Sequence, residues 1–215
     1  MVTNACRALL AGAAFFIAGS APAQVRQPTE PVECEREAAC LRALKGLAAR
    51  QGEVLRLKLA DGKWKTLGSD KKACQRNDTA HCVIRELRAY RPEQSLFVVE
   101  WTTAGDGGSE IVSATTGEVE TLDTMPEFSP SGRWFVSVDP DELNERHYDI
   151  AIWSAEGGEV TPAFSYMRPA NAYEAWEFEG WDGDDRIRLR VTRANGTPVE
   201  TEAVHTETGW MLKRP

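Results

Sequence analysis

The fold is decided by residues 126–160, which read PEFSPSGRWFV at 126–136, YDIAIW at 148–153 and AEGGEV at 155–160. The first segment places a tight turn directly before a bulky, β-branched run, which is typical of a turn that leads into a buried strand. The second segment has the composition of another strand, and the third contains the two glycines of a hairpin turn. These residues therefore predict consecutive antiparallel strands.

The hairpin at 155–160 has three counterparts elsewhere in the chain. Each counterpart consists of a strand, a short turn that ends in glycine and a second strand, and the four glycines are Gly62, Gly117, Gly158 and Gly209. Glycine at this place suits the positive φ of a tight hairpin. The glycines are 55, 41 and 51 residues apart, so the spacing predicts an internal repeat of about four units.

The unit at 126–163 resembles one blade of the WD-repeat and TolB-type β-propellers, whose blades carry a Ser-Pro-Asp-Gly-like turn and an Ile-x-x-Trp-like third strand. Ser131 and Ser154 stand where those blades usually carry aspartate. The resemblance is weaker at 90–122 and 173–214. It implies an all-β fold, a small and incomplete propeller-like stack of about four blade-like antiparallel sheets, and it implies no particular activity. A β-sandwich is the alternative fold, and the repeat period favours blades.

Residues 1–23 are predicted to be a signal peptide that lies outside the fold. The apolar run Ala8–Ala18 is too short to span a bilayer as a helix, and Ala21 and Ala23 are the small residues that a signal peptidase reads. The mature chain then begins at Gln24 and has a net charge of −9, because one arginine is removed from a chain of net charge −8. We expect a periplasmic or secreted protein without a transmembrane segment in its mature chain.

Two regions follow the predicted signal peptide. Residues 24–52 are expected to form an arm and one short N-terminal helix at Glu33–Arg50, in which four residues make one apolar stripe, namely Ala38, Leu41, Leu44 and Ala48. Gly52 is expected to end this helix. From residue 53 the hydrophobic period changes to two, so 53–215 is expected to form the all-β, propeller-like domain.

Four cysteines remain after the predicted cleavage, and an even number in an exported chain predicts two disulfides. Three connectivities are possible, and short loops favour Cys34–Cys40 and Cys74–Cys82. Cys34 must then precede the helix, because six helical residues would turn the two side chains about 240° apart. The spacings lack the tight pairs of a four-cysteine zinc site.

The segment at 174–185 interleaves aromatic and acidic residues. By strand parity Trp176 and Phe178 share one face, whereas Trp181 has the opposite parity and stands at the end of the strand. One interpretation is a strand with a buried aromatic face. The other is a binding surface for a basic partner, composed of Trp176, Trp181, Asp182, Asp184 and Asp185. The same three aspartates are a weak candidate for a calcium ion, although aspartate and glycine are also ordinary turn residues.

Composition and motifs exclude more functions than they identify. The chain is 42% hydrophobic and 27% charged, as in ordinary globular proteins, and its acidic balance argues against nucleic acid as a partner. No Gly-x-Ser-x-Gly elbow is present and the three histidines are scattered, so no catalytic or metal-binding residue is assigned.

The functional expectation is a non-enzymatic, exported binding protein whose partner is a basic protein or another component of the cell envelope. A specific version is an inhibitor of, or an immunity protein against, a basic enzyme that degrades the envelope. The alternatives are a secreted hydrolase with an unrecognised active site and a purely structural envelope protein.

Overall fold

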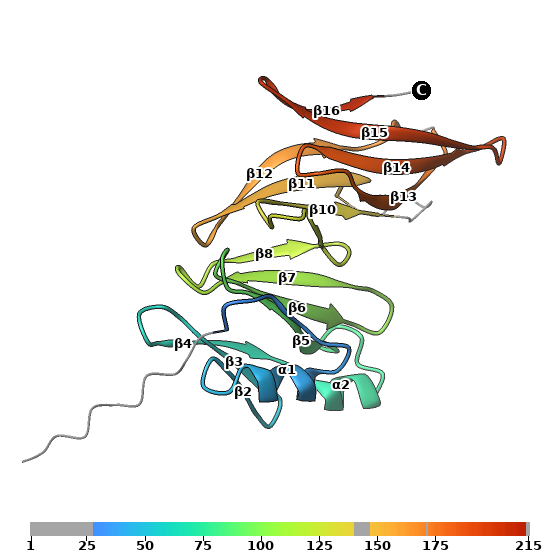
Figure 1. Cartoon of the computed structure of the whole chain (residues 1–215). Coiled ribbons are helices and arrows are strands. Elements are labelled where there is room, and N and C mark those ends of the chain that lie inside the picture. Colours follow the sequence, from blue (N-terminus) through green and yellow to red (C-terminus); the bar gives the residue numbers. More distant parts are fainter. Residues whose placement is uncertain (1–27, 140–146, 171, 214–215) are drawn as a thin grey trace, which may run out of the picture.

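The computed structural model describes residues 28–139, 147–170 and 172–213, and the predicted signal peptide lies outside this part of the chain. The described part of the chain is all-β, with 53% of its residues in strands and 7% in helices. Its strands form four antiparallel sheets that are stacked in sequence order, from the first sheet and both helices at the bottom of Figure 1 to the last sheet at the top. The expected all-β class and the expected number of antiparallel sheets are therefore confirmed.

Each sheet is built from strands that are mostly adjacent in the chain. The first holds β2 (Ala48–Gln51), β3 (Val54–Lys58) and β4 (Trp64–Gly68). The second has the order β1 (Val32–Glu33), β5 (Ile84–Arg91), β6 (Leu96–Thr102), β7 (Gly107–Ser113), β8 (Val119–Leu122). The third has β9 (Glu127–Phe128), β10 (Trp134–Val138), β11 (Ile150–Glu156) and β12 (Glu159–Tyr166). The fourth has β13 (Glu174–Trp181), β14 (Arg186–Arg193), β15 (Pro198–Thr206) and β16 (Gly209–Lys213).

Three hydrophobic cores lie between the four sheets. Because side chains alternate across a strand, the two inner sheets contribute to a core on each face. On β10, Phe135 packs into the second core, whereas Trp134 and Val136 pack into the third. On β6, Phe97 packs into the first core and Val98 into the second. The continuous apolar runs that predicted buried strands thus belong to sheets that are covered on both faces.

The fourth sheet ends the stack with a charged outer face. Arg186 and Arg188 on β14 are exposed, and the Arg186 Nη1 donates to Glu202 Oε2 at 2.7 Å across to β15. A face that carries such ion pairs does not need a further sheet to cover it. Within the described residues the sheets do not close into a ring, and the first and last sheets lie at opposite ends of the stack (Figure 1).

The four repeated turns form as the glycine spacing predicts. Gly62, Gly117, Gly158 and Gly209 all have positive φ, at 86°, 78°, 88° and 111°. At Gly158 space is also limited, because a Cβ atom there would lie 2.3 Å from the Thr115 Oγ1 of the preceding sheet.

The expectation for the N-terminal helix was wrong in its length. Helix α1 spans only Glu37–Ala43, and Ala48–Gln51 is β2, which pairs with β3 through a hairpin at Gly52, where φ is 59°. Leu44 and Ala48 are buried as the apolar stripe predicts, but the chain turns between them at Gly46, which has φ of 88°. Residues 24–52 therefore also supply strands to the first two sheets.

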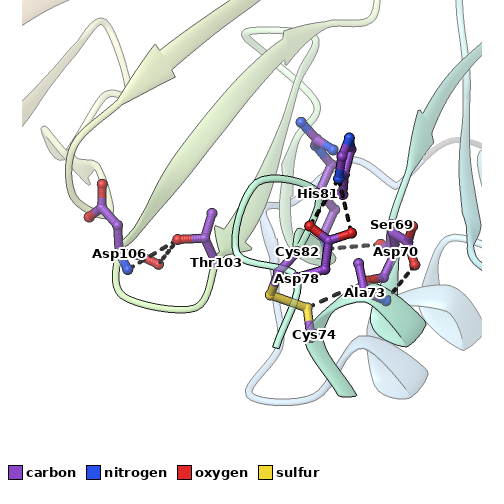
Figure 2. Close-up of a disulfide and its surroundings, with 10 residues drawn as sticks. Ser69, Asp70, Ala73, Cys74, Asp78, His81, Cys82, Thr103 and Asp106 are labelled. Atoms are coloured by element: carbon purple, nitrogen blue, oxygen red, sulfur yellow. Dashed lines mark hydrogen bonds and ion pairs between the residues drawn. A yellow bond between two sulfur atoms is a disulfide. The ribbon is translucent and has the colours of Figure 1, made fainter. Parts of the chain in front are cut away.

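Both expected disulfides are present. Cys34 precedes α1 and bonds to Cys40 within it, with the two Cα atoms 5.6 Å apart. Cys74 bonds to Cys82, with a Cα–Cα distance of 4.5 Å. Cys74 lies in a second short helix that the sequence did not indicate, α2 (Lys71–Gln75), whose first turn is capped by the Asp70 carboxylate (Figure 2).

Removal of the second disulfide is expected to destabilise the fold. Replacement of Cys74 and Cys82 together by serine should lower the free energy of unfolding by about 2–3 kcal/mol, because the unfolded chain regains the entropy of a short loop. Urea denaturation followed by circular dichroism measures the loss. Thiol titration of the denatured wild-type protein is the control, and four free thiols in protein recovered from the periplasm would contradict the assignment.

Candidate functional site

Trp176 and Phe178 on β13 share one face as strand parity predicts, but Trp181 does not lie on the opposite face. Trp176 pairs with Val191 and Trp181 pairs with Ile187, but the register shifts by one residue between Phe178 and Gly180. This β-bulge, at which Gly180 has φ of 141°, returns Trp181 to the inward face. Trp176 is fully buried and Trp181 is half-buried against the third core, so the expectation that Trp181 has the opposite parity was wrong.

The three aspartates that follow Trp181 each interact with a different group. The Asp182 carboxylate lies 3.7 Å from Arg186, and Asp185 lies 3.5 Å from His205. The Asp184 carboxylate accepts a hydrogen bond from the Ser131 amide at 3.0 Å, and this bond lowers the pKa of Asp184. The described residues contain no cluster of three or more histidine, cysteine, aspartate or glutamate side chains that could hold a metal ion, so the structure adds no support for calcium here.

Trp181 contacts a strand that borders a groove which the sequence did not reveal. Its Nε1 donates to the Glu127 carbonyl on β9 at 3.1 Å. Residues of β9 also line a groove of about 580 Å³, which we call the acidic groove. It runs between β1 and β9, the edge strands of the second and third sheets. Its lining includes Glu33, Glu35, Arg88, Arg91, Met125, Glu127 and Phe128.

Both arginines of the acidic groove form ion pairs with glutamates. Arg91 forms an ion pair with Glu33, and its guanidinium carbon lies 4.4 Å above the centre of the Phe128 ring. Arg88 donates to Glu100 at 2.7 Å through Nε, and its Nη2 donates to Glu86 at 2.8 Å. The charge of Arg91 also acts on Glu127, whose pKa it lowers in part, although no ion pair joins the two side chains in the described residues.

Two carboxylates of the groove are unpaired. Among the described residues, no hydrogen bond or ion pair reaches the side chain of Glu35 or Glu127, and both residues are exposed. Partial desolvation of the Glu127 carboxylate, together with the charge of Glu33, raises its pKa, and the charge of Arg91 opposes this shift. A cation near Glu127 would relieve this repulsion, and the exposed Met125 offers apolar surface beside it.

The described residues contain no serine hydroxyl paired with a histidine, which is the arrangement that nucleophilic catalysis by serine requires. The buried Ser137 hydroxyl lies 2.6 Å from the Thr124 hydroxyl and accepts from the Tyr148 hydroxyl at 2.9 Å. Burial raises the pKa of Tyr148 to about 12, so this phenol stays protonated and acts as a hydrogen-bond donor at neutral pH. None of the described histidines forms a hydrogen bond to a serine hydroxyl, and each lies near an aspartate instead.

The groove escaped sequence analysis because its residues are separated in the chain. Glu33 and Glu35 were assigned to the start of a helix, whereas Glu33 lies in β1 and Glu35 follows it. Glu127 stood in the turn motif that indicated the fold. The only sequence signal is that all three are acidic, and nothing in their spacing predicts that β1 and β9 adjoin.

Comparison with protein-family models, with curated proteins and with solved structures found no match. The propeller resemblance therefore depends on the sequence motif. Within the described ranges, no helix combines the length and the apolar character needed to cross a membrane.

Proposed function

We propose that this protein is an exported, non-enzymatic binding protein of the cell envelope, and that it binds a basic protein partner through the acidic groove. The observation that carries the proposal is the pair of unpaired carboxylates, Glu35 and Glu127, in a groove of about 580 Å³. Predicted export and the two disulfides support a location in the periplasm or outside the cell.

The chemistry of the acidic groove suits a lysine or arginine side chain. Such a side chain combines an aliphatic stem with a cationic head, and the groove combines the apolar surface of Met125 and Phe128 with two free carboxylates. The net charge of −8 of the whole chain would also speed the approach of a basic partner. Inhibition of, or immunity to, a basic envelope-degrading enzyme is the specific role that we propose for this binding.

The arrangement of the sheets supports the propeller-like interpretation that underlies this proposal. In the third and fourth sheets the strands follow chain order from one edge to the other, as in propeller blades. The edge strands β1, β9 and β13 would then face the centre of an incomplete ring. In this interpretation the acidic groove and Trp181 line that centre, the place where a partner would enter.

Neutralising the two free carboxylates is expected to weaken partner binding. The mature protein is immobilised, used to capture basic proteins from the envelope extract of its own organism, and compared with Glu35→Gln/Glu127→Gln. The captured protein should bind the double variant at least about tenfold more weakly, and its affinity for the wild-type protein should fall as salt rises. Surface plasmon resonance with the purified partner measures both effects.

The matched control is Glu200→Gln/Glu207→Gln, which makes the same change in charge at two exposed residues of the fourth sheet. This control should keep at least half of the wild-type affinity. Capture of no basic protein, or equal affinity of the two double variants, would overturn the assignment of the acidic groove.

A further inference from the structure

The second sheet has a free edge on the side opposite the acidic groove. Its strand order places β1 at one edge and β8 at the other. Ser113 donates its amide to the Glu118 carbonyl at 3.0 Å, and this bond fixes which residues of β8 bond to β7. In an antiparallel ladder the backbone groups of alternate residues point to opposite sides. The N–H and C=O groups of Val119 and Thr121 therefore point away from β7, and no strand pairs with them in the described part of the chain.

Two hollows lie beside this edge, between β8 and the edge strand β12 of the third sheet. One has a volume of about 280 Å³, and its lining combines apolar residues such as Val119 and Val160 with the polar Ser113 and two glutamates. The other has a volume of about 380 Å³ and is lined by Trp153 and Phe164, among others. Glu120 lines both hollows, so they are adjacent along β8.

The two edge strands that border the hollows differ in their capacity to pair. Pro162 lies within β12, and proline has no backbone N–H to offer to an added strand. β8 has no proline, so each of its residues keeps a backbone N–H.

The charge beside β8 indicates what kind of segment fits. Glu118 and Glu120 flank the edge, and Glu156 and Glu159 lie in the hairpin next to it, whose Gly158 lines the smaller hollow. Arg133 forms an ion pair with Glu156 at 2.9 Å, but the described residues place no cation within hydrogen-bond reach of Glu118, Glu120 or Glu159. The edge is thus acidic as well as unpaired.

We propose that β8 is a second binding site, which takes up an extended, basic segment of a partner protein as an additional antiparallel strand. The backbone of Val119 and Thr121 supplies the ladder bonds. The hollows take apolar side chains of the added strand, and Glu118 and Glu120 attract its lysine or arginine side chains. This site is separate from the acidic groove, since the two lie at opposite edges of the second sheet.

The test uses a synthetic peptide of alternating valine and lysine, eight residues long with blocked ends. Because this peptide is basic, it is titrated into the Glu35→Gln/Glu127→Gln protein, whose acidic groove has lost its free carboxylates. Binding is measured by fluorescence anisotropy of the labelled peptide. Amide hydrogen exchange measured by NMR should show that Val119 and Thr121 gain protection when the peptide binds.

The decisive variant is Thr121→Pro, which removes the outward N–H without removing a bond to β7. We expect it to weaken peptide binding at least about tenfold, whereas Thr121→Val, which keeps the N–H, should stay within about twofold of the parent protein. Circular dichroism checks that both variants fold. Glu118→Gln/Glu120→Gln, which keeps the backbone intact, should weaken binding and reduce its salt dependence.

Three results would overturn the proposal. They are an unchanged affinity of Thr121→Pro, protection that appears at another edge such as β16 and not at β8, and no binding at millimolar peptide. A peptide of alternating valine and glutamate that binds equally well would overturn the assignment of a basic segment.

Discussion

Trp176→Ala is expected to lower the free energy of unfolding by about 3–5 kcal/mol. Trp176 lies on β13 with only 2% of its surface exposed, and it packs edge-on against Tyr166 of β12 with ring centroids 5.5 Å apart. Truncation would leave a cavity in the core that joins the third and fourth sheets. Urea denaturation followed by circular dichroism measures the loss.

Two variants serve as controls for Trp176→Ala. The Trp176 Nε1 has no hydrogen-bond partner in the described structure, so Trp176→Phe removes volume but no hydrogen bond and should cost less than half as much. Trp181→Ala should also cost less, because Trp181 is half-buried. A loss below 1 kcal/mol for Trp176→Ala would show that the fourth sheet does not pack on the third as described.

Arg168→Met is expected to destabilise the fold by about 3–5 kcal/mol, because it leaves a buried carboxylate without its cation. Arg168 follows β12, and its side chain is 1% exposed, as against 4% for that of Asp149, which lies 3.6 Å away. The Arg168 amide also donates to the Asp149 carboxylate, and its guanidinium donates to the Glu174 carbonyl on β13. Thermal and urea unfolding measure the effect.

The comparison for Arg168→Met is Arg186→Met, which breaks an exposed ion pair with Glu202 and should cost about 0–1 kcal/mol. Burial raises the pKa of Asp149, and removal of Arg168 would raise that pKa further. A raised carboxyl pKa means that the folded state binds the proton more tightly than the unfolded state. Arg168→Met should therefore regain part of its stability as the pH falls from 7 towards the ordinary pKa of aspartate. Equal losses for the two variants at pH 7 would contradict the buried pair.

Local patterns predicted the sheets well, because local chemistry determines them. A glycine at the turn and alternating apolar residues at Ile187, Leu189 and Val191 are sufficient to indicate a hairpin and its buried face. The same rules failed where one residue changed the register. Nothing in the run from Trp176 to Trp181 shows that a bulge precedes Gly180, yet this bulge decides which face Trp181 occupies.

The helix and the groove show a second limit. The stripe at Ala38, Leu41, Leu44 and Ala48 fits a helical period, but pairing with β3 gives Ala48 a strand partner that a single helix lacks. The acidic groove is lined by residues about 90 positions apart in the chain, such as Glu35 and Glu127. Their proximity follows from the way in which the sheets stack, and local sequence patterns do not indicate which distant residues lie together.

The linear order of the sheets has a thermodynamic consequence. The first and fourth sheets each share one hydrophobic interface, whereas the second and third sheets each share two. In such a one-dimensional array, stability is approximately a sum of unit and nearest-neighbour contributions. The terminal sheets can therefore open at a lower free energy than the middle pair. Unfolding would then begin at the terminal sheets. The strands β1, β8 and β9, whose edges carry both proposed binding sites, belong to the two middle sheets, which would stay folded longest.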